Sequence, residues 1–265
     1  MKSQFPASLT VLAVLYLFAC KSKDSNAPAA AIAADTLRYE MRTFVKHYCV
    51  NDTQCADFNI IYPDIAGDSA QTKMIKDAIR ARIVEGVGGN GQLPFEIALD
   101  SAAVNFINDF IQFKREVPAQ DADQNIQMTG SVTLNNPKIA TVRLDFNSFR
   151  GGAHPNSAVA VMTFDRASGR ELNINDFIRD TTVVLPLLEK AYKEAKGLKP
   201  ADDISQLLLL NATKLALPAN VGILKEGILF AYGDYEVSPH AVGPADIVLS
   251  WEQLGALADK KRWLE

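Results

Sequence analysis

A short connection between two strand-like segments places the strongest constraint on how this chain folds. Residues 149–157 read Phe-Arg-Gly-Gly-Ala-His-Pro-Asn-Ser, which combines a glycine pair, a histidine and an Xaa-Pro bond. Glycine permits positive φ and close backbone approach, and proline fixes its own φ. The segments on either side, 138–149 and 158–165, are strand-like, and the first alternates between apolar and polar residues. The pattern predicts a sharply turned antiparallel strand pair.

The rest of the chain alternates between strand and helix patterns. The predicted elements are a hairpin (36–48 with 58–62), helices at 70–85 and 98–115, strands at 125–134, 139–149 and 157–164, helices at 182–196 and 204–214, strands at 221–224, 228–232 and 246–250, and a final helix from Trp251. A composition of 48% hydrophobic and 22% charged residues supports a substantial core. We expect an α+β fold with antiparallel sheets and packed helices, in two closely associated halves, 36–120 and 121–265.

The N-terminus predicts export and lipidation. Residues 1–19 have the short basic start and apolar stretch of a signal peptide. The stretch ends in Leu-Phe-Ala-Cys, which resembles a bacterial lipobox with Cys20 as the lipidated residue. Residues 20–35 are too polar to fold and predict a tether. We therefore expect a membrane partner through a lipid anchor, at the outer membrane and either periplasmic or surface-exposed. The alternative is a plain signal peptide or N-terminal anchor with an incidental cysteine.

Two further cysteines, Cys49 and Cys55, flank a short polar segment in the predicted hairpin. In an oxidising compartment they predict a disulfide that closes the hairpin tip. A metal site is the alternative, although His47 is the only evident additional ligand nearby.

Two motif-like stretches lack the context that their chemistry requires. Residues 86–91 spell G-x-G-x-x-G but follow a predicted helix, whereas a dinucleotide site needs a preceding strand and a following helix. Residues 121–125 resemble a calcium loop, yet Ile126 and Val132 stand where glycine and glutamate are needed. The net charge is -4 and no basic run occurs, which argues against nucleic acid. No cofactor and no metal is predicted.

The connection at residues 149–157 and a second loop, residues 234–244, form the candidate site. Aromatic and amide side chains on loops suit recognition of sugars or peptides. The candidate ligand-binding residues are Arg150, His154, Asn156, Tyr235 and His240. The competing interpretation is structural: the glycines form a bend, and the histidine and tyrosine hold it in place.

Catalytic arrangements are weaker alternatives. A metal could be held by His154 and His240 with Asp145, Asp234 or Glu236, but the spacing matches no established ligand motif. A serine triad would require Ser148 or Ser157 beside His154, and no G-x-S-x-G segment is present. No catalytic residue is predicted.

Several segments together resemble a known family. They are Gly-Gly-Ala-His-Pro-Asn at 151–156, Phe-Asp at 164–165 with Ser-Gly-Arg-Glu-Leu at 168–172, Gly-Ile-Leu-Phe at 227–230, Tyr-Glu-Val-Ser-Pro at 235–239 and Gly-Pro at 243–244. The chain resembles, over about residues 39–254, the uncharacterised envelope domain shared by the extracellular part of the lysozyme-sensing anti-sigma factor RsiV and the N-terminal region of PdaC-type peptidoglycan deacetylases. His240 departs from the tyrosine that the family often has.

The resemblance implies a module of the cell envelope. Neither the cytoplasmic helix of the anti-sigma factor nor a deacetylase domain is evident in the chain, so neither role carries over directly. We expect a non-enzymatic envelope lipoprotein that binds cell-wall glycan or a protein such as lysozyme. A hydrolase or metal-dependent enzyme acting on cell-wall material is the alternative, and assembly with another envelope protein is a third possibility.

Overall fold

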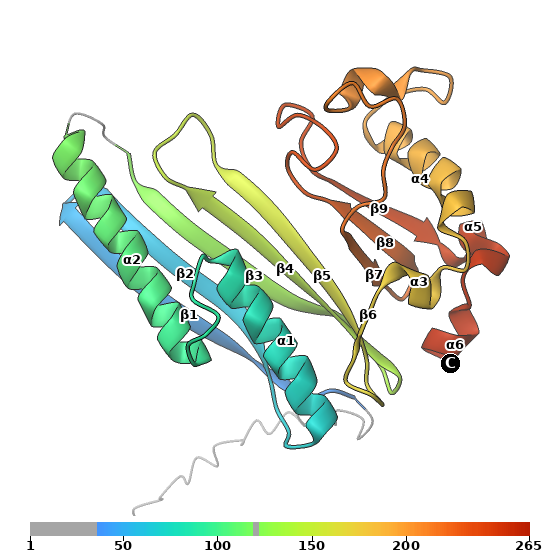
Figure 1. Ribbon diagram of the computed structural model, residues 1–265, viewed down its shortest axis with the longest axis horizontal. Helices are drawn as coiled ribbons and strands as arrows, with labels where there is room; N and C mark the ends of the chain where they lie inside the picture. Colours follow the sequence, from blue (N-terminus) through green and yellow to red (C-terminus); the bar gives the residue numbers. More distant parts are fainter. Residues whose placement is uncertain (1–35, 119–121) are drawn as a thin grey trace, which may run out of the picture. The chain divides into compact units, whose positions relative to one another are not determined.

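The computed structural model describes residues 36–118 and 122–265, which form two β-sheets with helices packed on each (Figure 1). The predicted signal peptide, Cys20 and the tether lie outside the described residues. The first sheet has the strand order β1-β2-β3-β4-β5-β6 and the second has the order β7-β8-β9. Among the described residues no helix combines the length and the apolar character of a membrane span. The two sheets with helices packed on each confirm the predicted α+β class.

The six-stranded sheet takes strands from both predicted halves, and the domain boundaries themselves stay predictions. Its strands are β1 (Tyr39–Asn51), β2 (Gln54–Ile65), β3 (Gln124–Asn135), β4 (Ile139–Phe149), β5 (Asn156–Asp165) and β6 (Glu171–Leu172). All neighbours pair antiparallel except β2 and β3, which are parallel. Antiparallel sheets were expected, and the β2–β3 pair is the exception, because two helices intervene and form a crossover connection.

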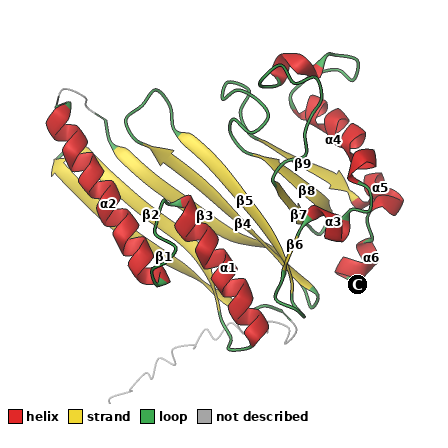
Figure 2. Cartoon of the chain, viewed as in Figure 1, coloured by secondary structure: helices red, strands yellow, loops and turns green. Residues whose placement is uncertain are grey.

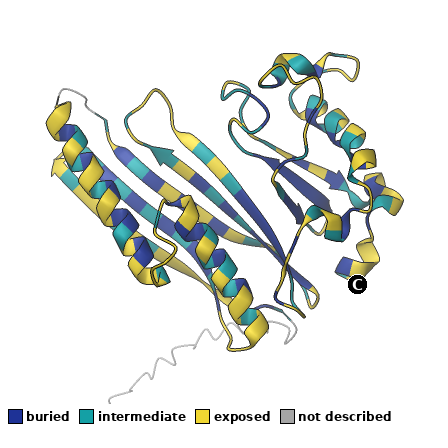
Figure 3. Cartoon of the chain, viewed as in Figure 1, coloured by how far each residue is buried: buried dark blue, intermediate teal, exposed yellow. Residues whose placement is uncertain are grey.

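Helices α1 (Ala70–Gly86) and α2 (Phe95–Glu116) cover one face of this sheet (Figure 2). In α1 the buried residues Ile75, Ile79 and Ile83 recur every four positions, which forms one apolar stripe. Phe106 and Phe110 do the same in α2. The stripes pack on alternate residues of the strands, and Figure 3 shows this alternation along β3 to β5.

The three-stranded sheet, β7 (Asn220–Ile223), β8 (Gly227–Tyr232) and β9 (Ala245–Ser250), packs against α4 (Thr181–Ala195). The shorter elements are α3 (Ile174–Phe177), the 3-10 turns η1 (Ile204–Leu207) and η2 (Gly255–Leu257), α5 (Trp251–Leu254) and α6 (Lys260–Leu264). The predicted helix at 204–214 was wrong beyond Leu207. Leu210 and Asn211 have φ of 56° and 58°, a left-handed backbone that ends a right-handed helix.

The two sheets meet through a buried contact that we call the threonine pair, Thr141 of β4 and Thr163 of β5. The Ile223 amide donates to the Thr163 hydroxyl (3.1 Å), and the Thr141 hydroxyl donates to the Ile223 carbonyl (2.7 Å). The two hydroxyl oxygens lie 3.0 Å apart, and both threonine side chains are fully buried. Side chains of the first sheet thus satisfy the outer edge of β7, which would otherwise present bare backbone groups.

The predicted disulfide between Cys49 and Cys55 is present. The two cysteines are directly opposite each other in the β1–β2 register, next to the turn that joins the strands. The hairpin continues through Pro63 to Ile65, whereas the sequence pattern ended it at the proline. Gly130 of the neighbouring strand β3 leaves room for Pro63, since a Cβ atom on Gly130 would lie 2.7 Å from the proline ring.

Candidate functional site

Two loops that are distant in sequence meet at one surface, where three rings stack. His154 comes from the β4–β5 loop, and Tyr235 and His240 come from the β8–β9 loop. The His154 and His240 ring centroids are 3.9 Å apart at an interplanar angle of 14°. Tyr235 lies 5.7 Å from His240 at 20° and is 49% exposed. We call these three residues the ring cluster, and it brings together three of the five predicted ligand-binding residues.

Hydrogen bonds assign one tautomer to His154. Its Nδ1 lies 3.1 Å from the Pro155 carbonyl oxygen, so Nδ1 carries the proton and donates. Nε2 is then the acceptor for the Tyr235 hydroxyl at 3.3 Å. Both contacts are satisfied by a neutral imidazole, whose ring is therefore oriented by one loop and capped by the other.

The backbone around Tyr235 is held in place by Glu236. Tyr235 has a φ of 59°, an uncommon conformation for a non-glycine residue. The Glu236 carboxylate accepts hydrogen bonds from the Gly233 amide (2.8 Å) and the Ala219 amide (2.6 Å). The next two residues, Val237 and Ser238, are buried, and their burial anchors the loop. Tyr235 is thereby fixed facing outward.

Beneath the ring cluster lies a buried carboxylate, Asp234. Its side chain is 5% exposed, and one oxygen accepts a hydrogen bond from the Ser157 hydroxyl. The same oxygen lies 3.5 Å from His240 Nδ1. The other oxygen has no hydrogen-bond partner among the described residues. Ser157, Asp234 and His240 therefore form a polar chain that leads from β5 to the ring cluster.

Lys196 fixes the far end of the same loop. Its ammonium group donates to the carbonyl oxygens of residues 242–244, at 2.8 to 2.9 Å. Burial lowers the pKa of Lys196, and the nearby Asp234 carboxylate opposes that change. The β8–β9 loop is thus held at both ends by charged side chains.

A cavity of about 210 Å³ opens beside this polar chain, between the first sheet and the β8–β9 loop. Its polar lining includes Arg143, Asn147 and Ser157. Arg143 is bound to Asp145 (2.8 Å) and to Asp246 (2.6 Å). The hydrogen bond that Arg143 donates to the Asp145 carboxylate raises the pKa of Arg143, so its charge is permanent. The cavity offers amide, hydroxyl and guanidinium groups next to an exposed aromatic surface.

The other two predicted residues lie elsewhere. Arg150 is positioned over the Phe106 ring of α2 (5.1 Å) and lies 3.5 Å from Asp109. Arg150 and Asn156 line a separate cavity of about 330 Å³, together with the C-terminal end of α1. The structure therefore does not bring them to the ring cluster.

Among the described residues, the side chains considered for catalysis are engaged in other contacts. Ser157 binds Asp234 directly, so no histidine lies between the hydroxyl and the carboxylate as a triad requires. Asp145 is ion-paired with Arg143, and the Glu236 carboxylate accepts hydrogen bonds from backbone amides. In the part of the chain that the structure describes, the one three-residue group with metal-ligand spacing is His47, Cys49 and Cys55, whose sulfurs are bonded to each other.

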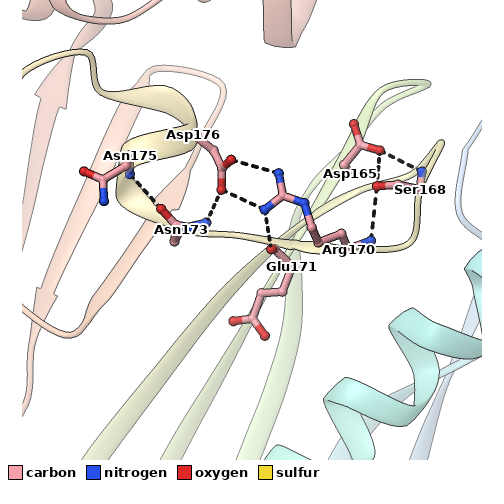
Figure 4. Close-up of polar contacts among 7 residues, drawn as sticks. All are labelled: Asp165, Ser168, Arg170, Glu171, Asn173, Asn175 and Asp176. Atoms are coloured by element: carbon pink, nitrogen blue, oxygen red, sulfur yellow. Dashed lines mark hydrogen bonds and ion pairs between the residues drawn. The ribbon is translucent and has the colours of Figure 1, made fainter.

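The segment 164–172, which belongs to the family-like signature, has a structural role. In Figure 4 the Asp165 carboxylate accepts from the amide and the hydroxyl of Ser168, which closes the turn after β5. Gly169 has a φ of 76° and lies against the backbone of Gln71. Arg170 forms two hydrogen bonds to Asp176, at 3.0 and 2.8 Å. These residues shape the connection into α3 and follow the end of β5 that is opposite the β4–β5 loop.

Sequence reasoning missed Asp234 and Ser157 as partners of each other. Each had been considered only for catalysis or metal binding. The one signal was that Asp234 directly precedes Tyr235 in a turn, which does not reveal that its side chain is buried.

Two family models match the chain, in tandem. Residues 49–157 match the model described as Deacetylase PdaC, and residues 175–252 match the model of a protein of unknown function, DUF3298. Two segments of the chain thus match the PdaC and DUF3298 models, as the resemblance predicted, and these matches are consistent with a cell-envelope-associated protein. His154 lies in the first matched segment, while Tyr235 and His240 lie in the second, so the ring cluster joins the two.

Solved structures of the DUF3298 family share this fold. A member from Bacteroides fragilis is 16% identical, with a TM-score of 0.65, and the match covers 84% of this chain and 94% of that one. A member from Pseudomonas aeruginosa is 15% identical, with a TM-score of 0.59 and the same coverage of both chains. No curated protein matches the sequence.

Proposed function

We propose that this protein is a lipid-anchored, non-enzymatic binding protein of the bacterial envelope, whose ring cluster contacts cell-wall glycan or a protein such as lysozyme. The observation that carries the proposal is the ring cluster itself. Two loops hold three rings in a stack at the surface, where His154 and Tyr235 are 81 residues apart in sequence and Tyr235 is about half exposed. Fixed aromatic groups of this kind lose little conformational entropy when they bind a ligand.

The chemistry of the surroundings suits a polar ligand with an apolar face. The ring faces offer apolar contact area, and the adjoining cavity supplies Asn147, Ser157 and the charged Arg143. A glycan combines these properties, since its rings have CH faces and hydroxyl edges. A protein ligand would use the same rings as a buried anchor.

Thermal unfolding of the full chain with separate additions of muropeptide and lysozyme tests the proposal. A ligand that binds only the folded state stabilises it by about 2.7 kcal/mol at a hundredfold excess over its Kd. Stabilisation by muropeptide identifies a glycan ligand, and stabilisation by lysozyme identifies a protein ligand. Tyr235→Ala should weaken binding at least about tenfold. Tyr48→Ala, which removes a comparably exposed tyrosine on β1, should leave it unchanged.

Absence of stabilisation by either probe would overturn the binding proposal. Turnover of muropeptide that disappears in His154→Ala would favour the hydrolase alternative instead. The lipid anchor is tested separately. Cys20→Ser should move the protein from the detergent phase to the aqueous phase in cells that process lipoproteins.

A further inference from the structure

A histidine and an aspartate stand beside the disulfide at the tip of the β1–β2 hairpin. His47 is directly opposite Asp57 in the strand register, and Cys49 is directly opposite Cys55. Residues two apart on a strand point to the same face, so these four side chains form one block. The block lies on the face of the sheet away from α1 and α2, because the alternate residues Ala56 and Phe58 are the buried ones.

The donors and acceptors of the contacts within the block can be assigned. His47 Nδ1 lies 2.6 Å from Asp57 Oδ1, and His47 Nε2 lies 3.0 Å from Cys49 Sγ. A carboxylate and a disulfide sulfur both lack a proton, so each can only accept. Both contacts are satisfied together when both ring nitrogens carry protons. The geometry therefore matches an imidazolium held between Asp57 and the sulfur of Cys49.

We propose that the Cys49–Cys55 disulfide is a thiol–disulfide exchange site that reacts with an external dithiol, with His47 as the proton donor to Cys49. A thiolate of the dithiol attacks Cys55 Sγ and forms a mixed disulfide, and the bond between the two cysteines breaks. The electron pair goes to Cys49 Sγ, which takes the proton from His47 Nε2. The second thiol of the reductant then displaces Cys55, whose thiolate is protonated by solvent. Two electrons and two protons pass to the chain, and the reductant is released as its disulfide.

The surroundings favour Cys49 over Cys55 as the first leaving group. A neighbouring imidazolium stabilises a thiolate, and a better leaving thiolate departs faster. Near Cys55 the charge is of the opposite sign, since the Asp123 carboxylate accepts from the Cys55 amide at 2.7 Å. Lys46 points to the other face of the sheet and pairs with Asp100 of α2 at 2.7 Å. Asp57 acts as a positioning residue, because it holds the ring through Nδ1.

The sulfurs are accessible enough for such a reaction. Both cysteines are half-buried, at the end of the hairpin, and the His47 and Asp57 side chains are 54% and 48% exposed. Among the residues that the structure describes, no further strand pairs with the outer side of β1. A reducing partner can therefore approach without displacing any described element.

Reduction kinetics test the inference in the full chain carrying Cys20→Ser, which leaves two cysteines. The rate constant for reduction by dithiothreitol, expressed per concentration of its thiolate, is measured between pH about 5 and about 9. In the parent protein this constant should be higher at the acidic end of the range than at the alkaline end, as expected for a step that uses a protonated imidazole. His47→Gln should lower it at least about tenfold at the acidic end and remove the pH dependence. Asp57→Asn should give a smaller loss and displace the pH profile.

The matched control is Lys46→Gln, on the same strand but the opposite face, which should behave as the parent does. Thermal unfolding of each variant establishes that the fold is retained. Equal reduction rates in the parent and in His47→Gln across the pH range would overturn the inference.

A second measurement uses the reduced protein. Alkylation by limiting iodoacetamide near pH 6 should modify Cys49 before Cys55, and His47→Gln should abolish the preference. Preferential modification of Cys55, or the same preference in both proteins, would equally overturn it.

Discussion

The threonine pair is the sharpest test of how the two sheets are joined. The Ile223 amide donates to Thr163, and the Thr141 hydroxyl donates to the Ile223 carbonyl. Because the Thr141 proton is committed to Ile223, the proton between the two hydroxyls must come from Thr163. The order of donation around the contact is thus fixed by its geometry.

This order predicts unequal effects for two isosteric substitutions. Thr163→Val leaves one buried group without a partner, the Ile223 amide. Thr141→Val leaves two, the Ile223 carbonyl and the Thr163 hydroxyl proton. Each orphaned buried group costs about 1–3 kcal/mol. We expect losses in the free energy of unfolding of about 1–3 kcal/mol for Thr163→Val and about 2–6 kcal/mol for Thr141→Val.

The double variant separates this argument from simple packing loss. It leaves only the two backbone groups of Ile223 unpaired, the same number as Thr141→Val alone. Its loss should therefore be smaller than the sum of the single losses by about 1–3 kcal/mol. Thr129→Val, on the exposed part of β3, serves as the control and should change stability by less than about 0.5 kcal/mol.

Urea unfolding of the full chain, followed by circular dichroism and by tryptophan fluorescence, measures all four variants. Coincident transitions of the two probes allow a single free energy to be assigned. Additive losses in the double variant, or a larger loss for Thr163→Val than for Thr141→Val, would refute the assigned order of donation.

Two further predictions concern the framework around the site. Gly222→Ala would place a Cβ atom 2.4 Å from Val161 Cγ1. It should reduce the free energy of unfolding by about 1–3 kcal/mol and lower the melting temperature. The control Gly152→Ala, whose Cβ atom would meet nothing within 4 Å, should leave the melting temperature unchanged. Arg170 lowers the pKa of Asp176, so their pair stabilises the fold above the ordinary aspartate range and this stabilisation is lost as pH falls through the folded-state pKa. Asp176→Asn should therefore reduce stability near pH 7 by less than about 1 kcal/mol and flatten its decline in acid, measured as melting temperature against pH.

Local patterns predicted most of the secondary structure. The apolar spacing of α1 and α2, the alternation of β3 to β5 and the cysteine hairpin all depend on neighbouring residues, and they were found close to the expected positions. The parallel pairing of β2 with β3 could not be read in this way, because it joins segments separated by two helices. The false helix at 204–214 arose from a run of leucines whose periodicity hides two left-handed residues.

The candidate site was predictable where glycine and proline marked its loops. Those residues drew attention to His154, Tyr235 and His240, which the structure brings together. Arg150 was included because it is adjacent to the same turn. Its side chain instead extends over Phe106 of α2, a contact between segments remote in sequence. Burial of Asp234 was likewise invisible, since a charged residue in a turn is ordinarily exposed.

The parallel pair β2–β3 also determines how demanding the sheet is to assemble. The β1–β2 hairpin closes through a tight turn, but β2 and β3 can pair only after residues 66–123 have been brought back along the sheet. Loop closure over that length costs about 3.5 kcal/mol of chain entropy beyond a constant term. Because α1 and α2 occupy most of the connection and pack on the strands that it joins, their burial offsets this entropy. The helices that cover the sheet therefore also help β2 and β3 to pair during folding.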